Sequence, residues 1–252
     1  MRSAFCVLIT KPVRTTPDGT GRHRPPSNGR ISRYCDLKVR KPTNELGVWT
    51  GEQMRRFVDH LAADRLVAVW RLLLTTGMRR GELLGTRWRD LHITAGRLTI
   101  RQTMTMVDGQ PEQGTPKSTA GGRTISIDAG TMAALRQWKR QQAAERLAIG
   151  GAWRGDADLI VTETDGAPVH PQMFSRRFKA HAKACGLPAI RLHDTRHSYA
   201  TVALAAGVPV KVLSQRLGHA DIGVTLRIYA HVMPGDDEAA ATLAANAILG
   251  KL

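Results

Sequence analysis

The sequence predicts a mainly helical protein with one small antiparallel β-sheet, that is, an α+β fold. From Val48 onward, most segments repeat their apolar residues at helical spacing. Two segments, 97–103 and 123–128, instead alternate apolar and polar residues, which is typical of half-buried strands. The chain has 252 residues, 42% of them hydrophobic, so it can bury a substantial core.

Residues 1–44 differ from the rest of the chain in charge and periodicity. They contain ten Lys and Arg residues and two Asp residues, a net +8 out of a formal charge of +16 for the whole chain. Proline and glycine interrupt them, and no apolar period is visible. We interpret them as a basic, disordered arm that either tracks phosphates or is a leader without a role. Residues 45–252 then form the folded domain.

The charge balance predicts a polyanionic partner. The sequence pI is about 10.8, and no acidic block offsets the basic residues. The three cysteines are scattered without a CxxC pair, which favours a reducing cytoplasm over a disulfide framework or a zinc site. The longest apolar run near the start, Ala4–Ile9, is too short for a signal peptide or a membrane span. We therefore expect a cytoplasmic protein with no membrane partner.

Two helices open the folded domain. A capping-box pattern at Thr50 starts the first, and the second, roughly 64–76, is apolar on nearly all sides and should be buried. Gly77 ends the second helix, and a short helix follows. Arg79 lies at its start, where backbone N–H groups also attract anions. Glu82 shares a helix face with Arg79 and either holds it in place or forms a solvated pair with it.

The strands 97–103 and 123–128 predict a small antiparallel sheet with a long loop between them, and 158–162 is interpreted as a third strand. Lys117 lies in that loop, isolated in an arginine-rich chain. It suggests proton transfer, because lysine can release its proton and arginine effectively cannot. Plain surface charge is the alternative.

Further helices are predicted at 131–147, from Pro171 onward and at 236–249. The helix that begins at Pro171 carries a basic stripe of the kind that lies along a nucleic-acid backbone, with a solvated face as the alternative. The members of this stripe are Arg176, Arg177, Lys179 and Lys183.

The segment 191–232 concentrates reactive side chains on three short helical segments. His193 and Arg196 are three residues apart, so they share one helix face. His219 lies at the break after the second segment, and Tyr229 follows ten residues later.

The motif HDTRH first suggests a metal site, because His193 and His197 have the spacing of zinc-hydrolase ligands. However, Arg196 in the same turn would repel a dication, and Asp194 is shorter than the usual glutamate base. We therefore expect no metal, and we interpret His197 as a packed or supporting histidine and Asp194 as a supporting residue.

A phosphodiester-transfer site explains these residues better. Arg79 and Arg196 can hold the non-bridging oxygens and stabilise a pentavalent transition state, so no cofactor is needed. Tyr229 can attack phosphorus, and His193 can take or position the phenolic proton. His219 can donate to a phosphate oxygen, and the loop lysine can protonate the departing 5′ oxygen.

These residues resemble those of the tyrosine recombinases, the phage integrase family, in order and spacing, and the resemblance covers about residues 45–245. The matching segments are TGMRRGE with Arg79, TPK with Lys117, LHDTRH with His193 and Arg196, and LGHADIGVTLRIYAHV with His219 and Tyr229.

The resemblance implies a recombinase-type catalytic domain on duplex DNA, 3′-phosphotyrosyl cleavage with a free 5′-hydroxyl, and strand exchange by a homotetramer on two DNA sites. It identifies the chain as a metal-independent site-specific recombinase or integrase of a mobile element, associated with the nucleoid when bound to DNA. It also implies that the final helix docks onto a neighbouring subunit, with packing on its own subunit as the alternative. A type IB topoisomerase-like enzyme and a catalytically weak DNA-binding protein are the alternative functions.

The front of the chain departs from the family pattern. Family members usually carry a separate helical DNA-gripping domain before the catalytic one, and here the basic arm of 44 residues stands in that position. We predict an N-terminally truncated integrase whose arm is a remnant or a replacement of that domain, unless partners supply the clamp. The chemistry should survive, and independent high-affinity site binding should not.

Overall fold

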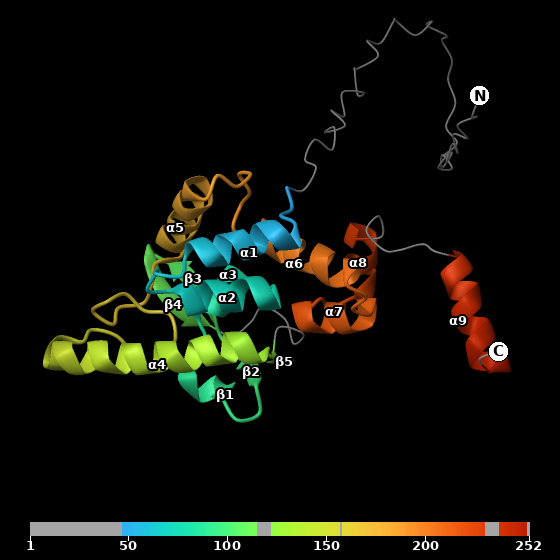
Figure 1. Ribbon diagram of the computed structural model, residues 1–252. Helices are drawn as coiled ribbons and strands as arrows, with labels where there is room; N and C mark the ends of the chain where they lie inside the picture. Colours follow the sequence, from blue (N-terminus) through green and yellow to red (C-terminus); the bar gives the residue numbers. More distant parts are fainter. Residues whose placement is uncertain (1–46, 115–121, 157, 230–236, 251–252) are drawn as a thin grey trace, which may run out of the picture. The chain divides into compact units, whose positions relative to one another are not determined.

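The computed structural model describes residues 47–114, 122–156, 158–229 and 237–250 of the chain. These residues are mostly helical, with two small antiparallel sheets, so the predicted α+β fold is confirmed (Figure 1). The α-helices are α1 (Gly51–His60), α2 (Val67–Thr76), α3 (Arg80–Leu84), α4 (Ala129–Ile149), α5 (Pro171–Ala184), α6 (Asp194–Ala205), α7 (Val210–Leu217), α8 (Ile222–Tyr229) and α9 (Asp237–Leu249). None of the described helices is both long and apolar enough to cross a membrane.

Helix α1 begins at the predicted capping box. The Thr50 hydroxyl accepts a hydrogen bond from the backbone N–H of Gln53 (3.2 Å), and the Gln53 side chain accepts one from the backbone N–H of Thr50 (2.9 Å). Helix α2 lies between α1 and α4 (Figure 1) and is buried on nearly all sides, as its apolar sequence predicts. Because α2 is buried in the core, the turn at Gly77 that ends it is held in place.

An aromatic cluster joins α1, α2 and α5. The rings of Trp70 and Phe174 are stacked with their centroids 4.2 Å apart, and Phe57 meets Trp70 edge to face at 5.9 Å. All three side chains are fully buried, and such pairs add to the free energy gained from burying apolar area. The cluster fixes α5 on the core, which leaves its opposite face exposed.

The β-structure is more divided than the sequence analysis predicted. One sheet has three antiparallel strands in the order β1 (Leu91–His92), β2 (Arg97–Ile100) and β5 (Arg123–Ser126). The other is a hairpin of β3 (Thr103–Val107) and β4 (Gln110–Gly114). The predicted strand 97–103 is therefore broken in two, and part of the predicted long loop is a hairpin.

A two-residue turn at Asp108 and Gly109 closes the β3–β4 hairpin, and the sequence analysis did not identify it. Asp108 and Gly109 both have positive φ values, 46° and 79°. An Asp-Gly pair with two positive φ angles is the favoured two-residue hairpin turn. Strand β4 was not predicted because it contains Pro111, and proline usually argues against the interior of a strand.

The prediction of a third strand at 158–162 is wrong. Only isolated bridges occur there, one between Arg87 and Leu159 and one between Thr162 and Pro168. The apolar residues 159–161 are buried, but side chains and loops satisfy the backbone around them instead of a sheet partner.

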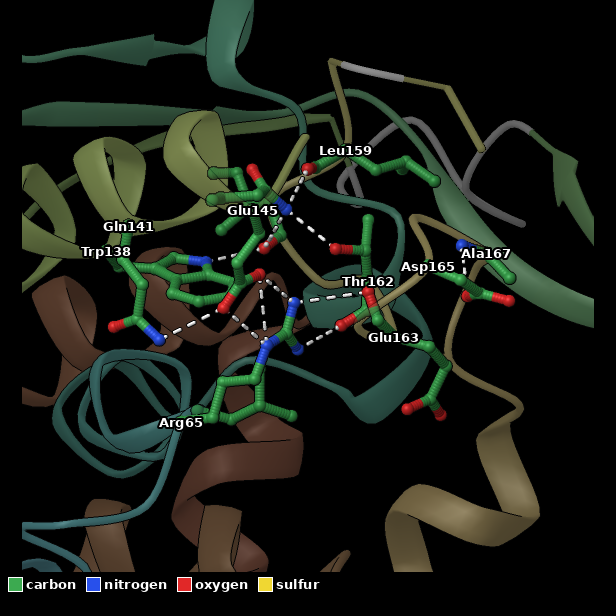
Figure 2. Close-up of polar contacts among 12 residues, drawn as sticks. Arg65, Trp138, Gln141, Glu145, Leu159, Thr162, Glu163, Asp165 and Ala167 are labelled. Atoms are coloured by element: carbon green, nitrogen blue, oxygen red, sulfur yellow. Dashed lines mark hydrogen bonds and ion pairs between the residues drawn. The ribbon is translucent and has the colours of Figure 1, made fainter. Parts of the chain in front are cut away.

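Arg65 is the main anchor of this segment (Figure 2). Its guanidinium pairs with Glu145 of α4 at 2.6 Å and donates to the carbonyl oxygens of Thr162 (2.7 Å) and Glu163 (3.1 Å). It also lies over the ring of Trp138, 4.6 Å from the centroid. One arginine thus ties the loop after residue 158 to α4, so an apolar run is held without becoming a strand.

Candidate active site

The first cation of the site is held at the start of α3. Gly77 ends α2 in the left-handed conformation (φ 62°), which lets the chain turn directly into α3. Arg79 is the N-cap residue of α3, and its guanidinium donates to Glu82 at 2.8 Å. Its side chain is 42% exposed, so an anion in solvent can reach it.

Glu82 is a buried anchor rather than a surface residue. Its carboxylate accepts from the backbone N–H and the side chain of Arg79, both at 2.8 Å. It also accepts two hydrogen bonds of 3.0 Å from the guanidinium of Arg123, the first residue of β5. Burial opposes the ionisation of Glu82, but the hydrogen bonds and charge of Arg123 and Arg79 lower its pKa below the ordinary value. The alternative of a solvated Arg–Glu pair is thus wrong.

Arg123 was missed by the sequence analysis. An arginine that begins an alternating strand looks like any solvent-facing strand residue, and no local pattern marks it. Its side chain is only 9% exposed in the structure because it reaches across to Glu82, which is 41 residues earlier in the chain.

Arg196, in the first turn of α6, is the second cation predicted to bind phosphate, and it is buried. Its guanidinium donates to the carbonyl oxygens of Gly77 (2.9 Å) and Leu217 (2.6 Å), which are neutral acceptors. Burial, and next the positive charge of Arg79, lowers the pKa of Arg196 to about 9, so it remains protonated at neutral pH.

The C-terminus of α7 gathers these arginines. The carbonyl oxygens of residues 216–218 accept from Arg123 (2.6 Å), Arg196 (2.6 Å) and Arg79 (3.4 Å) in that order. The last carbonyls of a helix lack intrahelical partners and carry partial negative charge, so they suit guanidinium groups. Because they are not anions, they hold the arginines in place without neutralising them.

His219 follows directly after the left-handed Gly218 that ends α7. Its Nδ1 lies 2.7 Å from the hydroxyl of Thr225, which is buried in α8. Burial, and then the nearby charges of Arg196 and Arg79, lowers the pKa of His219 to about 4, so its ring is neutral at pH 7. A Thr225 hydroxyl that donates to Nδ1 leaves the ring proton on Nε2, where it is a hydrogen-bond donor.

Tyr229, the last residue of α8, is almost completely buried at 2% exposure. Its hydroxyl oxygen lies 2.7 Å from Nδ1 of His197, one turn along α6 from His193. Burial raises the pKa of Tyr229 to about 12, and the charge of Arg196 opposes this rise. The contact with the phenol that was expected of His193 is thus made by His197, which agrees with the interpretation of His197 as a supporting histidine and not with that of a packed one.

His193 remains next to this pair as the N-cap residue of α6. Its ring meets that of His197 edge to face, with centroids 5.4 Å apart. Burial, and then Arg196, lowers the pKa of His193. Asp194, predicted to be a supporting residue, is buried and accepts from the backbone and guanidinium of Arg191, so it stabilises the first turn of α6.

The remaining predicted site residues are Lys117 and the basic stripe of α5. Lys117 falls within 115–121, outside the described residues. In the basic stripe of α5, three cations are exposed, whereas Arg177 pairs with Glu163 at 2.8 Å and is only partly exposed. The three exposed members are Arg176, Lys179 and Lys183.

The assembled geometry would suit an oxyanion bound beside a phenol. Arg79 and Arg196 offer fixed positive charge, and His193 and His219 are neutral rings close to it. Among the described residues, no three His, Cys, Asp or Glu side chains are grouped as ligands for a metal ion.

The family model described as the phage integrase family matches residues 48–235, which include every described residue of this site. The chain belongs to the phage integrase family. Among its curated relatives, a tyrosine recombinase XerC-like protein of Caldanaerobacter subterraneus is 29% identical over 77% of this chain. A putative prophage phiRv2 integrase of Mycobacterium tuberculosis is 32% identical over 73% of the chain. The chain spans about half the length of these relatives, 52% and 46% respectively.

Solved structures show the same fold. The Tn1549 transposon integrase, in complex with transposon right end DNA, superposes on 83% of this chain with a TM-score of 0.69 and 22% identity, and 68% of that chain is covered. The XerA recombinase superposes on 82% of this chain with a TM-score of 0.60 and 20% identity, and 65% of it is covered. The predicted family fold is therefore confirmed.

Proposed function

We propose that this phage integrase family member cuts and rejoins duplex DNA through a covalent bond to Tyr229, as a site-specific recombinase of a mobile element. The observation that carries the proposal is the placement of two guanidiniums, those of Arg79 and Arg196, on the end of α7, next to the helix that bears the phenol. A phosphoryl-transfer site requires positive charge that is already positioned before the substrate reacts.

In the proposed reaction, Arg79 and Arg196 bind the non-bridging oxygens of one phosphodiester, and their charge stabilises the pentavalent transition state. His219 and His193 add neutral donors to the same oxygens. The Tyr229 oxygen attacks phosphorus, which forms a 3′-phosphotyrosyl bond and breaks the bond to the 5′ oxygen. Lys117 protonates that oxygen, and the reverse sequence rejoins the strand. The two arginines supply the charge that a metal would otherwise provide.

The proposed substrate is double-stranded DNA. The exposed face of α5, with Arg176, Lys179 and Lys183, is well suited to contacts with the phosphate backbone. Arg177 contributes less, because Glu163 already neutralises it. The solved Tn1549 integrase was bound to DNA, which supports the same class of partner here. We place the active protein in the cytoplasm, on the nucleoid when bound.

Tetramer formation is part of the proposal. Helix α9 exposes Leu243, Ile248 and Leu249, each by at least 70% of its area. An exposed apolar face of this kind favours a partner surface, and we assign it to a neighbouring subunit on DNA. The domain boundary near residue 45 stays a prediction.

Covalent capture tests the activity. The 252-residue chain is incubated with nicked duplexes drawn from a randomised pool, and protein-linked DNA is recovered under denaturing conditions. We expect an adduct that EDTA does not diminish and that peptide mapping places on Tyr229. Tyr229→Phe should form none. An adduct with the Phe variant would exclude Tyr229 as the nucleophile, and no adduct with the wild type would exclude the activity for this chain.

A further inference from the structure

The histidine that contacts the phenol is not one of the residues assigned to the reaction above. Nδ1 of His197 lies 2.7 Å from the hydroxyl oxygen of Tyr229, a distance typical of a short hydrogen bond. The rings are tilted by 47° with their centroids 5.9 Å apart, so the contact is made through the polar atoms and not by stacking. His193 is one imidazole further away, since it meets the ring of His197 edge to face.

The groups around His197 indicate that the proton between its Nδ1 and the Tyr229 oxygen lies on the phenol. Groups that face His197 are His193, Asp194, Arg196 and Arg191 on α6 and just before it, His219 after α7, and Tyr229 on α8. Burial, and then His193, lowers the pKa of His197, so the ring is neutral at pH 7. With its own proton on Nε2, a neutral ring offers a lone pair at Nδ1 to the phenolic O–H.

We infer that His197 is the general base that accepts the proton of Tyr229 during strand cleavage and returns it during rejoining. This rests on the proposed function. As the bond between the phenolic oxygen and phosphorus forms, the O–H bond breaks and its proton moves to Nδ1. The bond from phosphorus to the 5′ oxygen breaks with its electron pair, and Lys117 protonates that oxygen. The imidazolium that results lies beside a transition state of increased negative charge, which favours it.

A buried phenol needs such a base more than an exposed one does. Tyr229 is 2% exposed, and its raised pKa of about 12 makes spontaneous ionisation rare at neutral pH. The same face of α8 carries Thr225, four residues earlier, which His219 holds. Helix α8 is therefore anchored at two points, and the two anchors are chemically different: one histidine bonds a hydroxyl that does not react, and the other bonds the nucleophile.

The test compares single-turnover adduct formation by the wild type and His197→Asn on the nicked duplex that the wild type captures best. The amide oxygen of Asn is bonded to Cγ, as Nδ1 is in His. It can therefore still accept a hydrogen bond from the phenol, but it is too weak a base to take the proton. We expect adduct formation to slow by about 100-fold or more, within the range of general-base effects. His181→Asn, on α5, is the matched control and should leave the rate unchanged.

Two further readouts separate proton transfer from mere support of the fold. The wild-type rate should level off above the pKa of His197, whereas the rate of His197→Asn should keep rising tenfold per pH unit. Replacing Tyr229 with a fluorinated tyrosine, which ionises more readily, should restore much of the lost rate in the Asn variant. The same replacement should change the rate of the wild type little.

Three results would overturn the inference while the proposed function stands, provided that wild type forms the adduct and Tyr229→Phe does not. One is a His197→Asn rate within threefold of wild type with the same pH profile. A second is a faster Asn variant, which would make His197 a restraint on the nucleophile. The third is a slow variant that the fluorinated tyrosine does not rescue, which would make its role structural.

Discussion

Substitution of Glu82 by Gln should destabilise the fold much more than a typical loss of an ion pair. Glu82 is buried and accepts hydrogen bonds from two arginines, Arg79 and Arg123. Glutamine keeps the shape of the side chain and one acceptor oxygen. Its amide group, however, points N–H donors at guanidinium donors, and two cations lose their shared negative charge.

The expected cost follows from the burial of each partner. Breaking a buried ion pair by removing one member costs about 3–5 kcal/mol, because the remaining charge is left uncompensated. The Arg123 side chain is 9% exposed and should bear the full penalty, whereas Arg79 is 42% exposed and is partly solvated. We therefore expect the free energy of unfolding to fall by about 3 kcal/mol, at the lower end of that range.

Urea unfolding at pH 7, followed by circular dichroism, measures this difference. Glu163→Gln is the matched control: it breaks the pair with Arg177, in which both side chains are about one third exposed, and should cost less than about 1 kcal/mol. Inorganic phosphate should stabilise Glu82→Gln more than the wild type at equal ionic strength, because it can replace the lost anion. A Glu82→Gln variant no less stable than Glu163→Gln would refute the reasoning.

Three other predictions concern DNA contacts, the turn before α3 and pH. Lys179→Ala should lower the slope of log K against log salt for DNA binding by about 0.9, and Arg177→Ala by clearly less; equal slopes would count against α5 as a DNA face. Gly77→Ala should destabilise the fold by more than 1 kcal/mol in thermal unfolding, because φ is 62° and a Cβ would lie 2.3 Å from Tyr199; a neutral result would contradict this. The pKa of His219 is lowered to about 4, so the folded state binds fewer protons than the unfolded state between pH 6.5 and 4. Stability should fall as the pH drops through that window, and His219→Asn should flatten the fall.

The sequence predicted those features of the fold that depend on neighbours along the chain. Periodicity located α1, α2, α4 and α5, and the capping box at Thr50 is present as expected. The hairpin of β3 and β4 was missed although the Asp108–Gly109 pair is visible in the sequence, because β4 contains Pro111 among polar residues and shows no alternation. The run 158–162 failed for a different reason: its burial is real, but a side chain nearly a hundred residues earlier, Arg65, holds it in place of a strand partner.

The site was predictable as a set of residue types but not as a set of contacts. Arg79, Arg196 and Tyr229 were identified because their order and spacing are distinctive. The partner of the phenol was assigned to His193, and spacing alone does not distinguish it from His197, one turn further on the same helix. Arg123 had no local signal at all, because its role depends on a carboxylate from another element.

The end of α7 links the two halves of the site. The carbonyl oxygens of residues 216–218 hold the guanidiniums that would bind phosphate, and the next residue, His219, holds Thr225 in the helix of the nucleophile. A displacement of this helix end would therefore move the anion site and the anchor of α8 together. Tyr229 is buried at one end of α8, so a movement of this helix that uncovers it would strain the bonds from His219 to Thr225 and from His197 to the phenol. We therefore expect phosphate bound to Arg79 and Arg196 to change the exposure of Tyr229 through α7.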